Sequence, residues 1–299
     1  MLIWKAKGGF VKALEADNLR FGKLPLARKK SVLATLNTHR QVILWNLPEF
    51  QRKLTIDWEE GESIHVLALS ADGKKLAMGG SNYQAGVEQR YGIVRLYDTQ
   101  TGRKLQEWDP LMQQVFEIRF GPAGNDFFIQ GRGRQQFVGH IPPMRTLHCD
   151  LLTHKEIAAA EPKAVDSMRT KLEITKDGSD YITDGDTPVP TIALWDAKTG
   201  QKTRTLFTGF GANSPTAIAI SPSGGILAVA KGVGSSLTFA QIDLLELESG
   251  KTIATLKGGH RKSISVLTFS DDGHLLASGS GDTTAVIWNV EGLEKKGVP

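Results

Sequence analysis

The sequence has 299 residues, of which 40% are hydrophobic and 23% are charged. These values are typical of soluble globular proteins and exclude a disordered or collagen-like chain. The net charge of +4, from 36 Lys and Arg against 32 Asp and Glu, is too small to indicate nucleic-acid binding by itself. No apolar stretch reaches the roughly 20 residues that a membrane-spanning helix needs. We therefore expect neither nucleic acid nor a membrane as a partner.

The beginning of the chain, MLIWKAKGG, lacks the apolar core of a secretory signal peptide. The chain has a single cysteine, Cys149, which rules out an internal disulfide and a cysteine-based zinc cluster. Both observations favour a cytoplasmic location.

Five short turns that contain glycine recur along the chain. Their glycines are 51, 54, 46 and 49 residues apart, and each turn separates two short segments in which apolar and polar residues alternate. Glycine supplies the positive φ that such turns require, and alternation with period two is typical of half-buried strands. We therefore predict hairpins at Ala71–Gly73, Pro122–Gly124, Lys176–Gly178, Pro222–Gly224 and Asp271–Gly273.

A second signal repeats about every 50 residues, where a β-branched strand ends in an aromatic residue followed by Asp or Asn. The clear examples end at Asn46, Asp98, Asp196 and Asn289, and weaker ones end at Asp150 and Glu246. A turn and a further short strand follow several of them. Four short strands per unit, repeated about six times, predict an all-β protein with radial repetition.

The repeat divides the chain into units within a single predicted domain, residues 1–299. Their approximate ranges are 7–56, 57–107, 108–160, 161–207, 208–256 and 257–291. The last unit supplies three strands, and residues 2–6 resemble the outer strand of the other units. We therefore expect this N-terminal strand to pair into the last unit and close the ring, which would remove an open sheet edge.

The segment from Gly259-His260 to Trp288-Asn289, with Asp272-Gly273 between them, resembles a WD40 repeat. The resemblance implies a β-propeller of four-stranded antiparallel blades. Six blades fit the turn spacing, and seven, the commoner number in WD40 propellers, is the alternative. It also implies a hydrogen-bonded tetrad of His260, Ser278, Asp282 and Trp288. Tyr97 and His148 stand where the family places tryptophan.

Catalytic and metal-binding motifs are weak in this sequence. Histidines 140, 148 and 154 surround Cys149, but neighbouring strand residues point to opposite faces, which argues against joint ligation of a metal. The acidic group at 177, 180, 184 and 186 lacks the spacing of a calcium loop, so turn formation is the better interpretation. No serine-nucleophile motif is present. We expect no enzyme activity, no catalytic residues, no metal and no cofactor.

Two sets of loops should share one face of the predicted propeller, and they are rich in aromatic residues and arginine, which dominate binding energy at protein interfaces. The alternative for the aromatic residues is burial between blades. The candidate partner-binding residues are Trp58, Tyr83, Arg90, Tyr91, Trp108, Met112, Arg132, Arg134, Phe137 and Phe210, and Leu111 lies among them.

These features predict a non-enzymatic scaffold, monomeric on its own, that binds other proteins or peptides across its loop face, as the family resemblance implies. One alternative is a propeller-type enzyme, similar to a lactonase or hydrolase, with a polar site at the central channel. Another is a module whose functional partner segments are encoded separately. The lining of the channel would distinguish the enzyme from the scaffold.

Overall fold

The computed structural model describes most of the chain as β-strands and turns. The described residues are 2–4, 10–13, 19–20, 26–27, 32–37, 39–47, 49, 51–59, 61–82, 91–134, 142, 144–153, 155–160, 172–184, 190–209, 214–232 and 239–293. Their regular structure is entirely β, and no helix among them is long and apolar enough to cross a membrane. The chain divides into two compact units, residues 1–159 and 160–299.

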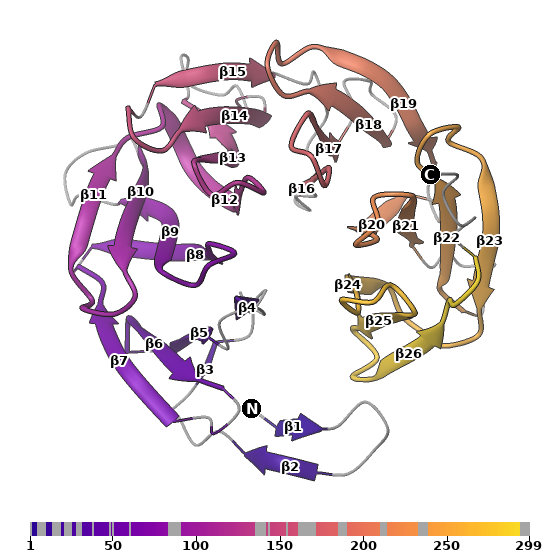
Figure 1. The fold of residues 1–299 in the computed structure, drawn as a ribbon, viewed down its shortest axis with the longest axis horizontal. Coiled ribbons are helices and arrows are strands. Elements are labelled where there is room, and N and C mark those ends of the chain that lie inside the picture. Colours follow the sequence, from indigo (N-terminus) through magenta and orange to yellow (C-terminus); the bar gives the residue numbers. More distant parts are fainter. Residues whose placement is uncertain are drawn as a thin grey trace. The chain divides into compact units, whose positions relative to one another are not determined.

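The first unit contains a hairpin and three sheets (Figure 1). The hairpin pairs β1 (Leu2–Trp4) with β2 (Phe10–Ala13). Sheet 1 contains β3 (Leu19–Arg20), β4 (Leu26–Ala27), β5 (Val32–Asn37), β6 (Gln41–Asn46) and β7 (Gln51–Asp57). Sheet 2 contains β8 (Glu62–Leu69), β9 (Lys75–Asn82), β10 (Tyr91–Asp98) and β11 (Lys104–Trp108). Sheet 3 contains β12 (Met112–Phe120), β13 (Asp126–Gly133), β14 (Met144–Asp150) and β15 (Glu156–Ala160).

The second unit contains three further sheets in chain order (Figure 1). Sheet 4 contains β16 (Leu172–Ile174), β17 (Asp180–Asp184), β18 (Thr191–Asp196) and β19 (Lys202–Thr208). Sheet 5 contains β20 (Pro215–Ile220), β21 (Ile226–Lys231), β22 (Gln241–Glu246) and β23 (Thr252–Lys257). Sheet 6 contains β24 (Ile264–Phe269), β25 (Leu275–Ser280) and β26 (Ala285–Asn289).

Short polar motifs build the turns that join these strands. Between the third and fourth strands of sheet 2, a carboxylate oxygen of Asp98 accepts hydrogen bonds from the backbone N–H of Gln100 and from both the N–H and the hydroxyl of Thr101. Asp150 and Asp196 do the same in sheets 3 and 4. Because these bonds join residues only two or three positions apart, the local sequence specifies the turns.

Consecutive sheets within each unit pack face to face. Leu44 of sheet 1 is buried with Leu76 of sheet 2, and Leu96 of sheet 2 is buried with Phe127 of sheet 3. In the second unit, sheets 4 and 5 share one apolar cluster, and sheets 5 and 6 share another. Each strand alternates between the two faces of its sheet, so an inner sheet supplies apolar residues to both of its neighbours.

These sheets are the antiparallel blades of a β-propeller, as the sequence predicted. The described part of the chain contains six sheets of three or more strands, which confirms six blades rather than seven.

The predicted pairing of residues 2–6 with the last sheet stays a prediction, because β1 and sheet 6 belong to different units of the chain. β1 pairs antiparallel with β2, and β26 ends sheet 6 without a fourth strand among the described residues. A partner strand only a few residues away costs much less loop-closure entropy than one at the opposite end of the sequence. The nearby Phe10–Ala13 segment therefore pairs readily with one edge of β1.

Candidate functional site

A chain of hydrogen-bonded side chains lies inside sheet 6, in which the Thr284 hydroxyl, 2.9 Å from His260 Nδ1, links His260 to Asp282. The Ser278 hydroxyl oxygen is 2.8 Å from His260 Nε2 and accepts a hydrogen bond of 2.8 Å from Trp288 Nε1. His260 Nδ1 is 3.3 Å from a carboxylate oxygen of Asp282. His260 and Ser278 are both buried, so these bonds replace lost contacts with water and join the second and third strands to the segment that enters the sheet.

Asp282 also organises the turn around it. Its carboxylate accepts hydrogen bonds from the Thr284 hydroxyl and from the backbone N–H groups of Thr284 and Arg261. The Thr284 hydroxyl and these N–H groups favour the ionised form and hold the pKa of Asp282 well below its usual range. The Asp282 carboxylate therefore has a structural role in sheet 6.

A shorter form of this arrangement occurs in sheet 1, where sequence analysis did not predict it. The indole N–H of Trp45 donates to the Thr35 hydroxyl over 2.8 Å. The register places this pair where sheet 6 has Trp288 and Ser278. The signal in the sequence was the hydroxyl of Thr35, which lies two positions after Leu33, the strand partner of Trp45.

The register also corrects one of the two predicted tryptophan substitutes. Tyr97 pairs with Leu76 as Trp288 pairs with Leu276, but in sheet 3 the equivalent residue is Cys149, which pairs with Phe127. His148 is one position earlier and lies on the other face. It stacks on Phe128 with ring centroids 4.2 Å apart and pairs with Asp126 over 2.6 Å.

Sheet 2 contains an ion network centred on Arg95, whose side chain is only 2% exposed. Two of its nitrogens donate to the Glu62 carboxylate over 2.6 and 2.8 Å, and a third donates to Glu107 over 2.8 Å. Its guanidinium carbon lies 4.8 Å from the centre of the Trp58 ring. These contacts join three strands of sheet 2 to the segment that arrives from sheet 1.

The network balances burial against charge pairing. Burial raises the pKa of Glu62, although its hydrogen bonds to Arg95 act in the opposite direction. Burial also disfavours the charge on Arg95, but Glu107 and Glu62 more than compensate, so the pKa of Arg95 is raised. The guanidinium is therefore a fixed cation that holds strands together.

One end of sheet 3 exposes a large apolar side chain in a strained conformation. Leu111 is 59% exposed and has a φ of 56°, which is unusual for a residue other than glycine. Its N–H donates to Asp109 over 2.8 Å, and the other carboxylate oxygen of Asp109 is paired with Arg134. The Asp109–Arg134 pair thus holds Leu111 toward solvent. The dipeptide Asp109-Pro110, typical of turn starts, was the sequence signal for this loop.

Two of the predicted partner-binding residues are buried, which corrects their assignment. Trp58 is 5% exposed and Met112 is 0% exposed, so neither presents a surface to a partner. Trp58 packs in the apolar cluster between sheets 1 and 2, and Met112 packs in the one between sheets 2 and 3. Trp108 is half-buried, with its ring 5.0 Å from that of Phe127. Although these residues lie near the ends of loops, burying their large apolar side chains gives more favourable free energy than exposing them to water.

The other predicted residues divide into two groups. Tyr91 is half-buried and accepts a hydrogen bond of 2.8 Å from Asn82, Arg132 is half-buried, and Arg134 is exposed. Tyr83, Arg90, Phe137 and Phe210 lie outside the described residues. Arg134, Leu111 and the edge of Trp108 therefore form the candidate surface, which we call the Leu111 surface, together with Asp109.

Comparison with protein-family models places the sheet 6 tetrad in a known context. The family model of the WD domain, G-beta repeat (WD40), matches residues 250–289, which include the last strand of sheet 5 and all three strands of sheet 6. The chain contains a WD40 repeat. The match covers the hydrogen-bonded chain from His260 to Trp288, so the resemblance seen in the sequence is confirmed.

A curated relative shares a short stretch of similarity. The chain is 40% identical over 73 residues to the periodic tryptophan protein 2 homolog of Schizosaccharomyces pombe. The aligned stretch is 24% of this chain and 8% of that relative. The chain therefore spans only a small part of the length of the curated relative that it matches.

A polar group on the first two strands of sheet 2 and the first strand of sheet 3 bears on the enzyme alternative. His65 Nε2 lies 3.1 Å from the Ser81 hydroxyl and 2.9 Å from Gln114 Nε2. Ser81 is only 4% exposed, so its hydroxyl is not presented to a substrate. These side chains form a polar contact between neighbouring blades, and the Ser81 hydroxyl is not the accessible nucleophile that a hydrolase needs.

The metal alternatives gain no support from the residues that the structure describes. Those residues contain no group of three or more His, Cys, Asp or Glu side chains that could hold a metal ion. His140, His154 and Asp186, and the side chain of Asp184, lie outside the description. Burial raises the pKa of Cys149 to about 12, so its thiol is protonated and unreactive.

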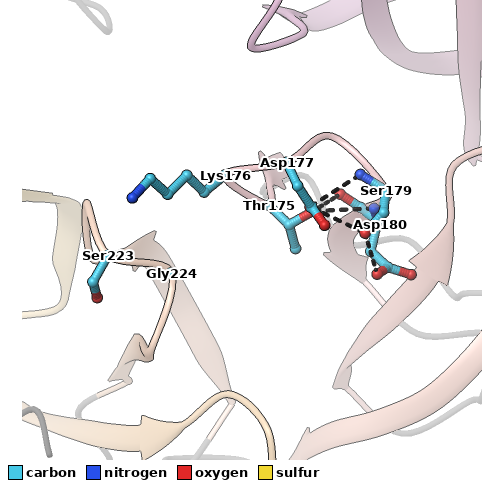
Figure 2. A pocket seen from close by; sticks show the side chains of 7 residues that line it. All are labelled: Thr175, Lys176, Asp177, Ser179, Asp180, Ser223 and Gly224. Atoms are coloured by element: carbon cyan, nitrogen blue, oxygen red, sulfur yellow. Dashed lines mark hydrogen bonds between the residues drawn. The ribbon is translucent and has the colours of Figure 1, made fainter. Parts of the chain in front are cut away.

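An open hollow of about 560 Å³ lies between the first turns of sheets 4 and 5. Figure 2 shows the Lys176 side chain extending toward Ser223 and Gly224, while Asp177 turns back into its own loop. Asp177 accepts hydrogen bonds from the hydroxyls of Thr175 and Ser179, and these lower its pKa. Asp177 therefore forms the turn, in line with the preferred interpretation of this acidic group.

Proposed function

We propose that this chain is a non-enzymatic scaffold that binds other proteins or peptides through the Leu111 surface. The WD40 repeat and the propeller fold support a protein-interaction role at the level of the family. Rigid sheets that position loops are well suited to recognition, because little entropy is lost when a partner binds.

The observation that carries the proposal is the conformation of Leu111. A leucine at positive φ costs free energy, and such strain persists where the surrounding structure enforces it, commonly at binding sites. Here the strained backbone places an apolar side chain in water, which opposes stability as well. A partner that covers Leu111 would recover the apolar burial, and Arg134 beside it would add a polar contact.

The test compares proteins captured from a lysate of the source cells by the wild-type chain and by Leu111→Asp. We expect the variant to lose its specific partner, with binding weakened at least tenfold in titrations with the purified partner, since an apolar anchor is worth about 2 kcal/mol. Leu152→Asp is the matched control, because Leu152 is 78% exposed at the opposite end of the same sheet. Equal loss in both variants, or no loss in Leu111→Asp, would contradict the proposal.

A further inference from the structure

The turns between the first and second strands of sheets 2, 4 and 6 have an aspartate at the same position. These aspartates are Asp72, Asp177 and Asp272. Each carboxylate accepts a hydrogen bond from the hydroxyl of the residue two positions earlier and another from the backbone N–H two positions later. The hydroxyl and backbone donors lower the pKa of all three carboxyl groups. This turn therefore favours a negative charge at the aspartate position.

Sheet 5 has Ser223 at the same position of its first turn. The N–H of Gly224 donates to the carbonyl oxygen of Ser221 over 2.9 Å, which is the backbone bond that the other turns also contain. The Ser223 hydroxyl oxygen lies 3.0 Å from the Ser221 hydroxyl oxygen and accepts a hydrogen bond of 3.0 Å from the N–H of Gly225. Sheet 3, by contrast, has Ala123 there, without a polar side chain. Ser223 thus makes the bonds of the aspartates but lacks their charge.

A cation lies on the adjoining turn of sheet 4. Lys176 is exposed, and its side chain extends toward Ser223 and Gly224 (Figure 2). The two turns are in contact, because a Cβ atom placed on Gly224 would lie 3.6 Å from the Cβ of Lys176. Within the part of the chain that the structure describes, no carboxylate is paired with the Lys176 ammonium. Both turns belong to the unit of residues 160–299, and their sheets share an apolar cluster, so this arrangement is independent of the first unit.

The hollow between these two turns, of about 560 Å³, has room for a phosphoryl group, and Ser223 is exposed beside it. A phosphate on serine carries a charge of about −1.5 to −2 at neutral pH and presents three strong acceptor oxygens. These oxygens would lie one bond beyond the Ser223 hydroxyl oxygen, on the side of the flexible Lys176 side chain. Asp177 and Asp180 also line the hollow, but their carboxylates accept hydrogen bonds within their own turn, and Figure 2 shows both on the far side of Lys176 from Ser223.

We propose that Ser223 is a phosphorylation site. A protein kinase transfers the terminal phosphoryl group of ATP to the Ser223 hydroxyl oxygen, so that the O–H bond breaks, an O–P bond forms, and ADP and a proton are released. The phosphate supplies the negative charge that aspartate supplies in the other turns, and it pairs with Lys176, which joins the turns of sheets 4 and 5. This site uses none of the residues of the Leu111 surface and does not depend on it.

The first test looks for the modification itself. The full chain is incubated with ATP, phosphatase inhibitors and a lysate of the source cells, and mass spectrometry measures the phosphate on each serine. Ser249 is the matched control, because it is exposed in another turn of sheet 5, where its hydroxyl donates to Glu246. We expect phosphate on Ser223 and at least tenfold less on Ser249. No phosphate on Ser223, or equal amounts on both serines, would overturn the proposal.

The second test measures the pair with Lys176. Full-length chains are made with phosphoserine in place of Ser223 or, as the control, in place of Ser249, and phosphorus NMR follows the titration of the phosphate. The second phosphate pKa should be lower at position 223 than at position 249, and Lys176→Gln should remove that difference. Phosphate at position 223 should also raise the melting temperature by about 2 °C. A phosphate pKa at position 223 that Lys176→Gln leaves unchanged, or a lower melting temperature, would contradict the pairing.

Discussion

Individual residues connect the strands of this protein in at least two different ways. In sheet 6 the connection is a chain of hydrogen bonds through Ser278, and in sheet 2 it is the ion network of Arg95. Both join the incoming segment to interior strands. The ion network carries the greater risk, since removal of one partner leaves a buried charge without compensation.

Arg95→Ala should therefore destabilise the protein by about 3–5 kcal/mol, because Glu62 would remain buried without its cation. Chemical denaturation followed by tryptophan fluorescence measures the change. Replacing both partners, in Arg95→Met with Glu62→Gln, should recover a large part of the loss. A loss below about 1 kcal/mol for Arg95→Ala would show that the pair contributes no more than an exposed ion pair.

At the scale of elements, the turns depend on ionised aspartates. Hydrogen bonds from neighbouring hydroxyl and backbone N–H groups lower the pKa values of Asp98, Asp177, Asp196 and Asp272 below their ordinary value. A depressed pKa in the folded state means that folding favours the ionised form. The resulting stabilisation is complete above the pKa of the unfolded chain, near 4.

We expect the melting temperature to fall as the pH is lowered from about 4 toward 2, because these carboxylates become protonated and lose their accepted bonds. Thermal unfolding followed by circular dichroism at a series of pH values measures this. Asp98→Asn cannot titrate, so its melting temperature should fall less than that of the wild type over the same range. An identical slope in both proteins would mean that Asp98 does not contribute.

At the scale of the whole molecule, the N-terminal hairpin is a separate small sheet. β1 and β2 pair with each other, and neither extends one of the six blades in the described pairings. An isolated two-stranded hairpin contributes little independent stability.

Deletion of residues 1–13 should thus change the free energy of unfolding by less than about 1 kcal/mol. Denaturant titration of the truncated and full chains provides the measurement, with size-exclusion chromatography as the check for aggregation. Strong destabilisation or aggregation would indicate that this segment closes an open edge, as the sequence first suggested.

The sequence by itself determined the repeating elements. The glycine turns, the alternating strands and the aspartates that start the turns are local features, and their hydrogen bonds join residues only a few positions apart. The six sheets followed from them, whereas the tetrad of His260, Ser278, Asp282 and Trp288 was implied by the resemblance to a WD40 repeat. The cytoplasmic location and the monomeric state stay predictions.

Only the tertiary structure decided which side chains are exposed and which strands pair over long distances. Trp58 and Leu111 both stand near loops rich in large residues, yet packing between sheets buries the first, and the Asp109–Arg134 pair exposes the second. These outcomes depend on contacts between segments far apart in the chain, which local patterns do not encode.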